Sequence, residues 1–331
     1  MHNCGGFSEC GNWYKGNLHS HTVNSDGMLK PEEAVKLYKD NGYDFLCLSE
    51  HDIYTDYRKE FNTEDFIIIP GIEYSAILYD KENKNRLKIH HVHGILGTEE
   101  MQNEAKCGLL KHMEHIPPLK FSGEWEGIKV SQQMVDMLKE HGCVTTYNHP
   151  IWSRVIEKDF TDINNVSALE IFNYNTVQEA GIGYNVTYWD LMLRKGKKIN
   201  GFASDDNHNE GVFNDSCGGW ICVKAPSLTH DNIIKAFISG NYYSSSGPKI
   251  YDFGIKDDVV YIKSSNVNKI NFICGNVIND GISILGEKFE DTLTYGEYKL
   301  KGHETYVRIE CIDKYGRTAW TNPIYLNWEN K

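Results

Sequence analysis

Short apolar runs alternate with amphipathic segments from about residue 13 to residue 245. Helical periodicity is clearest at 31–42, where Pro31 and two glutamates open the segment and Gly42 closes it. The alternation of buried strands with such helices is typical of α/β folding. The predicted strands are 12–21, 44–51, 65–75, 88–96, 143–150, 168–173 and 199–208, and the predicted helices are 31–42, 131–142, 188–196 and 230–241.

Two regions depart from this alternation. Residues 97–127 are polar and charged and carry Pro117-Pro118, so they are expected to form an insertion or a long loop. After residue 250 the helical periodicity disappears, and short apolar runs are separated by Gly, Asn and Asp turns, which predicts a small all-β, Ig-like sandwich. We place the boundary near Gly247-Pro248, which divides the chain into residues 1–247 and 248–331.

Composition narrows the possible partners and compartment. The formal net charge of -12 argues against binding to extended nucleic acid, whose phosphates demand a basic surface. No run approaches the roughly 20 apolar residues of a membrane span, and the first residues lack the apolar core of a signal peptide. The nine cysteines are scattered and odd in number, which favours reduced thiols in a cytoplasmic protein. We therefore expect a cytoplasmic protein with no membrane partner, whose oligomeric state the sequence does not indicate.

Histidines and carboxylates lie just after, or near the end of, most of the predicted strands. Because the carboxyl ends of parallel strands meet at one mouth of an α/β barrel, these side chains are expected to meet in one pocket. All are nitrogen and oxygen donors, which suit zinc, iron or manganese, and they exceed what one ion can bind. The candidates are His19, His21, Asp26, His51, Glu73, His91, His149, Asp206 and His208.

The motifs that carry these residues resemble those of the PHP family, named for polymerase and histidinol phosphatase domains. They are "NLHSHTVNSDG", "SEHD", "GIEYS", "HHVHG", "NHP" and "SDDNH", spread over roughly residues 13–247. The resemblance implies a distorted (β/α)7 TIM-like barrel with two or three metal ions at its mouth. It also implies the choice of His91 over His90 and His93, and of Asp206 over Asp205, from the usual spacing within each motif.

The resemblance further implies how the ligands are shared among the ions. One ion would be bound by His19, His21 and Asp206, and Glu73 would bridge it to a second. His91 and His149 would complete the second site, and a third would be formed by Asp26, His51 and His208. Of this set, Glu73, Asp206 and His208 are taken as the catalytic residues.

The predicted activity is hydrolysis of a phosphate ester, a phosphomonoester or small phosphodiester, by a hydroxide that bridges the metals. Arg154, just after "NHPIWS", is a candidate for clamping a small phosphorylated substrate, or else an ordinary surface arginine. Two other functions remain open: amidohydrolase-like cleavage of an ester, amide or carbamate, and a binding protein without turnover.

Overall fold

A computed structural model of the chain describes residues 3–7 and 11–328. Its first two thirds alternate strands with helices, so the prediction of an α/β fold is confirmed. The strands of this part are β2 (Asn12–Asn17), β3 (Phe45–Leu48), β4 (Ile53–Tyr54), β5 (Ile67–Tyr79), β6 (Arg86–Leu96), β7 (Glu114–His115), β8 (Leu119–Ser122), β9 (Cys143–Tyr147), β10 (Ala168–Asn173), β11 (Asn200–Ser204), β12 (Trp220–Ala225) and β13 (Tyr242–Ser245). The helices are α1 (Pro31–Asp40), α2 (Arg58–Phe61), α3 (Glu99–Asn103), α4 (Gly127–Glu140), α5 (Glu157–Phe160), α6 (Tyr174–Ala180), α7 (Val186–Arg194) and α8 (His230–Ile238).

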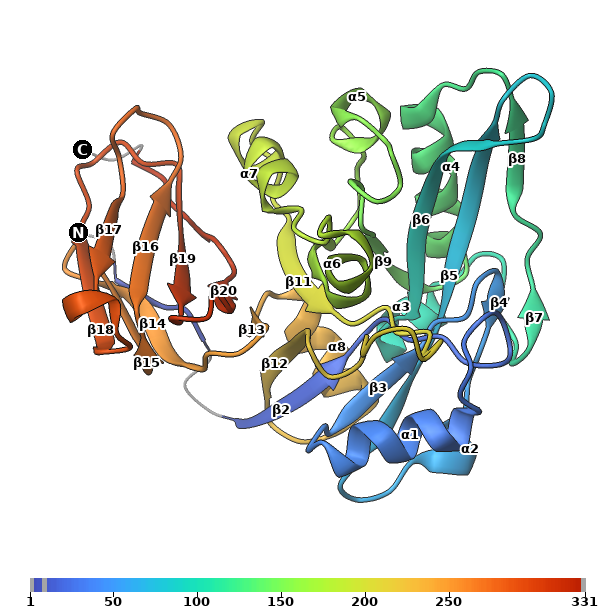
Figure 1. The fold of residues 1–331 in the computed structure, drawn as a ribbon, viewed down its shortest axis with the longest axis horizontal. Helices are drawn as coiled ribbons and strands as arrows, with labels where there is room; N and C mark the ends of the chain where they lie inside the picture. The colour runs from blue at the N-terminus through green and yellow to red at the C-terminus, as the bar shows by residue number, and fades with distance from the viewer. Residues whose placement is uncertain (1–2, 8–10, 329–331) are drawn as a thin grey trace.

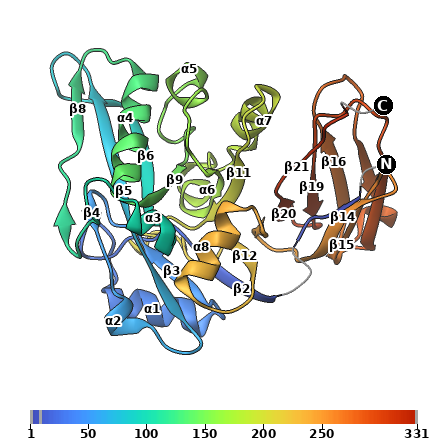
Figure 2. The same cartoon turned by 180° about the vertical axis from the view of Figure 1, so that it is seen from behind.

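One large sheet forms the centre of the molecule (Figures 1 and 2). Its strand order begins β11-β10-β9-β6-β5-β3-β2-β12-β13. Pairs on both sides of β6 are parallel, as in β2–β3–β5 and β9–β10–β11, whereas β6 runs antiparallel to both of its neighbours. The sheet curls so that β13 approaches the edge strand β11: Ser244 Oγ of β13 accepts from the backbone N–H of Ala203 in β11 at 3.1 Å.

Amphipathic helices cover this sheet. In α4 the buried residues Val130, Met134, Val135 and Leu138 recur every three or four positions, which places them on one face. They join a core with Ile72 of β5 and with residues of β6 and β10. On α8, Ile233, Ile234 and Phe237 pack in the same way against β3, β5 and β12. None of the helices in the described ranges is both long and apolar enough to cross a bilayer.

Strand β5 is longer than the sequence indicated. The expected strand ends near Ser75, but β5 continues to Tyr79 and forms a long antiparallel hairpin with β6. Residues 97–127, expected to be an insertion or loop, contain the short elements α3, β7 and β8, and β8 pairs in parallel with the end of β5. The sequence did not predict β8 because this strand lies at the sheet edge. Only its alternate residues are partly buried, so the segment has no apolar run that would mark a strand.

The last part of the chain is all-β in the described residues apart from one short 3-10 turn, Glu287–Phe289. Its strands are β14 (Ile250–Lys256), β15 (Val259–Val267), β16 (Lys269–Cys274), β17 (Ile282–Leu285), β18 (Leu293–Lys299), β19 (Tyr306–Ile312), β20 (Thr318–Thr321) and β21 (Ile324–Tyr325). β14, β15 and β18 form a four-stranded sheet with β1 (Cys4–Gly5), and their apolar residues share a core with β16 and β19.

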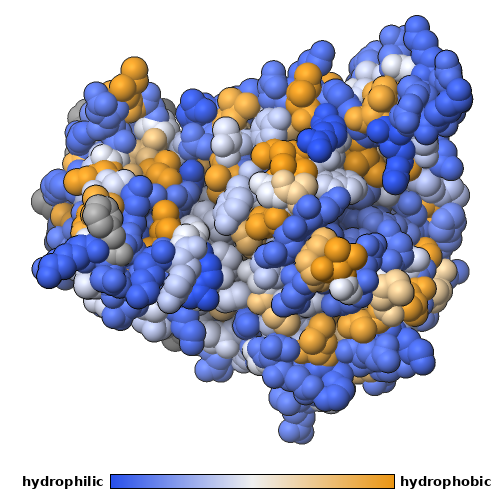
Figure 3. Space-filling model, viewed as in Figure 1, coloured by the Kyte–Doolittle hydropathy of each residue, from blue (hydrophilic) through white to orange (hydrophobic). Residues whose placement is uncertain are grey.

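Backbone pairing joins this all-β part to the α/β part. β13 pairs with β20, so the large sheet continues into β19, β16 and β17. Near the N-terminus, β1 pairs with β14, which places a segment of the first predicted domain on the second. The division at residue 247 therefore stays a prediction. Hydrophilic residues cover most of the face seen in Figure 3, with apolar residues in small groups between them.

Asn322, just after β20, links the two parts. Its Oδ1 accepts from the backbone N–H of Gly201 in β11 at 2.9 Å, and its Nδ2 donates to the carbonyls of Gly240 and Tyr242, each at 3.2 Å. The side chain is buried, so these backbone groups would lose their partners in its absence.

Replacing Asn322 with alanine should therefore lower the free energy of unfolding by about 1–3 kcal/mol, the usual range for stranding buried polar groups. The measurement is urea unfolding in the presence of a chelator, so that bound metal does not add to stability. The exposed Asn103→Ala is the matched control. Equal unfolding midpoints for the two variants would show that Asn322 does not hold the parts together.

Candidate metal centre

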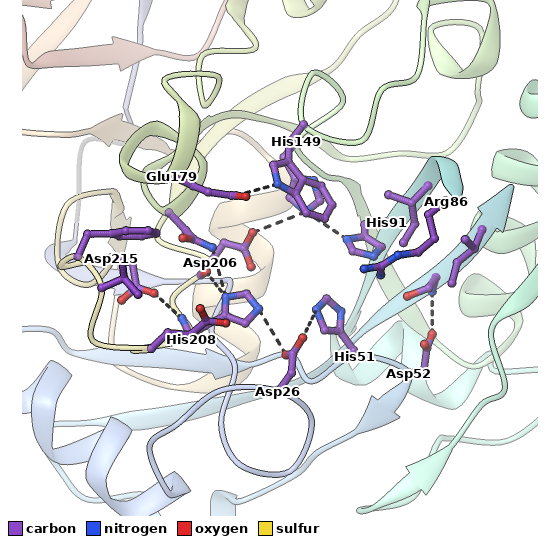
Figure 4. A pocket seen from close by; sticks show the side chains of 18 residues that line it. Asp26, His51, Asp52, Arg86, His91, His149, Glu179, Asp206, His208 and Asp215 are labelled. Carbon is purple, nitrogen blue, oxygen red and sulfur yellow. Dashed lines mark hydrogen bonds and ion pairs between the residues drawn. The ribbon is translucent and has the colours of Figure 1, made fainter. Parts of the chain in front are cut away.

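The predicted ligands come from separate segments that backbone hydrogen bonds join. Asp206 N donates to His19 O at 2.9 Å, and Glu73 N donates to Glu50 O, next to His51, at 3.0 Å. Asn148 N, next to His149, donates to His91 O at 3.1 Å. The loops that follow β2, β3, β9 and β11 are thereby fixed to one another and to β5 and β6, and their side chains converge (Figure 4).

Glu73 and His91 lie inside their strands rather than at the strand ends. The β5–β6 hairpin pairs Ser75 with His91 and Glu73 with His93, and it continues beyond both residues. Glu73 is fully buried. A nitrogen of each of His19, His51, His91 and His149 lies 3.1–3.3 Å from one of its two carboxylate oxygens. Glu73 is therefore the centre of the cluster.

Four groups of side chains each bring their ligand atoms within 4.8 Å of one another. The groups are His19, His21, Glu73 and Asp206; His21, Asp26, His51 and His208; His51, Glu73 and His91; and His19, His149 and Glu170. The structure thus brings together all nine residues singled out from the sequence. His51 accompanies Glu73 and His91 in one group, and His149 is also near that pair, since its Nε2 lies 3.3 Å from His91 Nδ1.

Several buried atoms of the cluster lack a hydrogen bond within the described part of the chain. They are His19 Nε2, His21 Nε2, His51 Nδ1, Glu73 Oε2 and Asp206 Oδ1. These atoms are not remote from one another: His19 Nε2 and His21 Nε2 each lie 2.9 Å from Asp206 Oδ1. Close approach without hydrogen-bond geometry is expected of ligand atoms that converge on a shared cation. The residues present therefore fit a metal site.

Glu170 is a member of the cluster that no motif indicated. Its Oε1 accepts from His19 Nδ1 at 2.8 Å and also from the Ser204 hydroxyl. Its Oε2 accepts from the backbone N–H of His149 and from Asn173 Nδ2, each at 3.0 Å. A carboxylate only accepts, so it keeps a proton of His19 on Nδ1, and Nε2, which faces Asp206 and Glu73, is the nitrogen that could bind an ion.

Other carboxylates fix the loops around the cluster. Asp205 accepts from the backbone N–H groups of Cys217, Gly218 and Gly219, and does not line the cavity that Asp206 lines. Asp215 Oδ2 accepts from the backbone N–H of His208 at 2.7 Å. Glu50 accepts from Thr22 N at 3.0 Å and so anchors the loop that carries Asp26. These contacts hold the ligand-bearing loops in place before any ion binds.

His90 and His93, the neighbours of His91, do not line the cavity. His90 Nδ1 lies 2.5 Å from the Tyr147 hydroxyl, on the other face of β6. His93 is buried below the cluster, where its ring meets that of His19 edge to face at 4.3 Å between centroids. Of the three, only His91 lines the cavity, and the choice of His91 as the ligand stays a prediction.

The pKa values of the cluster reflect its mixed charges. Burial alone would raise the pKa of Glu73, but His19 and His91 hold it well below its usual range. Burial alone would lower the pKa of His19, but Asp206, Glu73 and Glu170 raise it well above its usual value. At the mouth, burial opposes protonation of His208, yet Asp26 and Asp206 raise its pKa to about 9. With no other cation present, protons on histidines balance the carboxylates.

The cluster opens into a cavity of about 410 Å³ (Figure 4). Its walls carry six carboxylates, those of Asp26, Asp52, Glu179, Asp206, Glu210 and Asp215, but only one arginine or lysine, Arg86. Trp152 forms an aromatic wall beside His91 and His149. Arg154, the substrate residue suggested by the sequence, lies outside this cavity and lines a neighbouring one.

Comparison with known proteins gives similarity of structure only. No family model matches the sequence, and no curated protein matches it. Solved structures with a similar fold include a two-domain protein from Bacteroides vulgatus that contains a "predicted PHP-like metal-dependent phosphoesterase" (14% identity, TM-score 0.46, covering 96% of this chain and 97% of that one). A candidate metal-dependent phosphoesterase from Bifidobacterium adolescentis is 13% identical (TM-score 0.37, 68% of this chain and 95% of that one).

A third similar structure is an amidohydrolase from Chromobacterium violaceum with bound sulfate and no metal. It is 13% identical, with a TM-score of 0.40, and covers 69% of this chain and 96% of that one. At these values the function of the present chain has to be argued from its own site.

Glu170→Gln should weaken metal binding about 10- to 100-fold, the range typical of residues that orient a ligand. The glutamine keeps the size of the side chain but cannot accept at both of its terminal atoms. The dissociation constant is measured by competition with a chromophoric chelator. Exposed Glu60→Gln is the control, and equal affinities for the two variants would contradict the positioning role of Glu170.

Metal uptake should also release protons. His208, with its pKa near 9, is mostly protonated at pH 7.5 in the metal-free fold, whereas an ion binds only a neutral imidazole. Apparent affinity should therefore rise with pH from 6 and level off above about 9. Calorimetry in two buffers of different ionisation enthalpy measures the released protons directly, and a heat that does not depend on the buffer would refute this expectation.

Proposed function

We propose that the chain is a metal-dependent hydrolase that cleaves a phosphate ester. The observation that carries the proposal is the set of buried histidine and carboxylate atoms that converge without hydrogen bonds on one another. A cluster of this kind is suited to cations, and its nitrogen and oxygen donors suit manganese, zinc or iron. Nine donor residues, with Glu73 at their centre, are sufficient for two or three ions.

The sequence motifs suggest which residues would hold each ion, and the side-chain groups around Asp206 and around Asp26 support this allocation. His19, His21 and Asp206 would hold one, and Glu73 would be shared between that ion and a second held with His91 and His149. Asp26, His51 and His208 would hold a third, nearer to solvent. Such ions supply an activated water and offset the charge that develops on phosphoryl oxygens.

The chain's own groups would orient and protect this chemistry. Asn148 Nδ2 donates to Glu73 Oε1 at 2.8 Å, so the central carboxylate keeps one orientation. Asn173 Nδ2 does the same for Asp206 Oδ2 at 2.9 Å. Burial of the inner ligands excludes bulk water from the side away from the cavity, so a substrate would reach the ions only through the mouth.

The proposal includes a barrel for the first part of the chain, a sandwich for the second, and a location in the cell. We infer that the curled sheet of the first part is a distorted (β/α)7 barrel, supported by the contacts of β11 with β13. Residues 248–331 would form a β-sandwich accessory domain, supported by the core shared by β14, β15, β16 and β19. The described cysteines form no disulfide, and Cys47, Cys143 and Cys311 are buried, which supports a cytoplasmic location.

The test compares metal content with turnover. Elemental analysis after reconstitution with manganese, zinc or iron should find at least two ions per chain, and the loaded protein should release phosphate from an aryl phosphate but leave an aryl acetate intact. Preference for the acetate would favour an amidohydrolase-like activity, and ions without any turnover would favour a binding protein.

Glu73→Gln should reduce both the metal content and the turnover, the latter by orders of magnitude, because glutamine offers one neutral oxygen where a bridge needs two charged ones. The exposed Glu126→Gln is the control, and circular dichroism of both variants checks the fold. Near-normal turnover by Glu73→Gln would remove the bridging role of this residue.

A further inference from the structure

A second cavity of about 260 Å³ adjoins the metal centre. It lies between the start of β6, the turn after His149 and the end of α6, and it shares Arg86, Ile89, Trp152 and Glu179 with the main cavity. A molecule that reaches the ions could therefore extend along the Trp152 wall into this space. None of the nine predicted metal ligands lines this second cavity.

The charges of the second cavity differ from those of the first. Its lining includes Arg86, Lys88 and Arg154 but a single carboxylate, Glu179. Lys88 is already paired with Asp159 at 2.6 Å, and Glu179 accepts from Trp152 Nε1 at 2.9 Å. Because the Trp152 N–H is neutral, Glu179 keeps its negative charge, and the two unpaired arginines outweigh it by one positive charge.

The pairing of the arginines singles out this cavity. The chain has six arginines, and four of them, Arg58, Arg194, Arg308 and Arg317, form ion pairs with nearby carboxylates. Arg86 and Arg154 have no ion pair with any residue in the described ranges, although the chain has 46 acidic residues against 34 basic ones. Two unpaired guanidinium groups beside one cavity are suited to an anion, which they can bind with paired N–H donors.

Apolar groups form much of the lining of the second cavity. Leu87, Ile89, Ala180 and Ile182 line the cavity together with the ring of Trp152. The Trp152 ring is stacked against His91, with centroids 6.0 Å apart, and meets His149 edge to face at 5.1 Å. An apolar part of a ligand would therefore lie next to two metal-binding histidines.

The cavity is fixed to the metal centre by hydrogen bonds. Ile89 N of β6 donates to Ser153 O at 3.1 Å, which ties the strand that carries Arg86 to the turn that carries Arg154. Ser153 Oγ lies 3.1 Å from His149 Nδ1, so the same turn orients a predicted metal ligand. These hydrogen bonds fix the position of the arginines relative to the metal centre. Fixed positions are needed if one ligand is to contact both.

We propose that the second cavity is a leaving-group subsite that selects esters whose leaving group has an apolar body and a second anionic group. This inference rests on the proposed function, because it places the scissile phosphate at the metal centre. Arg86 and Arg154 would hold the second anion, a carboxylate or phosphate, while the apolar body lies along Trp152. The two arginines would be specificity residues with no part in the bond cleavage.

The test uses phosphonates, which bind like the ester but are not cleaved. The dissociation constants of 4-carboxybenzylphosphonate and of the neutral 4-carbamoylbenzylphosphonate are measured by calorimetry on the manganese-loaded protein. The carboxylate should bind about tenfold more tightly, a conservative expectation for a charged hydrogen-bonded contact. Arg86→Gln and Arg154→Gln should each remove most of this preference, and Arg194→Gln, which alters a paired arginine on α7, should leave it intact.

Equal affinity for the two phosphonates in the unaltered protein would overturn the subsite, and so would a preference that survives both arginine substitutions. Failure of both phosphonates to bind would overturn it as well. Phosphate release from phenyl phosphate separates this inference from the proposed function. Turnover of that ester with no preference for the carboxylate would leave the phosphoesterase proposal standing without the subsite, and no turnover of any ester would remove the proposed function itself.

Discussion

Buried negative charge is the constraint on which the rest of this structure depends. Glu73 and Glu170 are fully buried and Asp206 is nearly so, and a carboxylate in such a place is costly unless it is paired and hydrogen-bonded. Glu170 meets this requirement with four donors from the chain. Glu73 and Asp206 each keep one oxygen without a donor, and those oxygens lie where the histidine nitrogens converge. These oxygens are therefore available to a bound cation.

The strand arrangement follows from this requirement. The nine donors come from four loops and from strands β5 and β6, each of which contributes one to three of them. Backbone hydrogen bonds between these segments fix their relative positions. His149 and Asp206 have positive φ angles, which are uncommon for residues other than glycine, so two of the ligand-bearing loops contain sterically unfavourable turns. Such strain persists because the surrounding sheet over-determines the turns. Bound ions would add to the stability of the same arrangement through mass action.

The sequence was sufficient for the features that local patterns determine. The apolar face of α4 and the Pro31 start of α1 follow from periodicity and capping, and the donor residues share motifs short enough to be recognised. The β5–β6 hairpin was missed because an all-buried strand shows no period that marks its end or its direction. Glu170 was missed since a lone carboxylate in "ALEIFN" resembles a solvent-facing strand residue until tertiary contacts bury it. The sequence also offered no reason to single out Arg86. This arginine is of interest because it has no ion-pair partner among the described residues, and that can be seen only in the folded chain.

The order of binding follows from the same charges. Before ions bind, the main cavity presents six carboxylates and one arginine to solvent, and the chain as a whole carries a net charge of -12. A phosphate ester would be repelled from this cavity, whereas divalent cations would be attracted to it. Two or three divalent ions would offset most or all of the negative charge of the main cavity, and the arginines of the neighbouring cavity would add positive charge beside it. We therefore expect the ions to be resident in the protein and the anionic substrate to bind second, since only the loaded cluster gives its phosphate a favourable place.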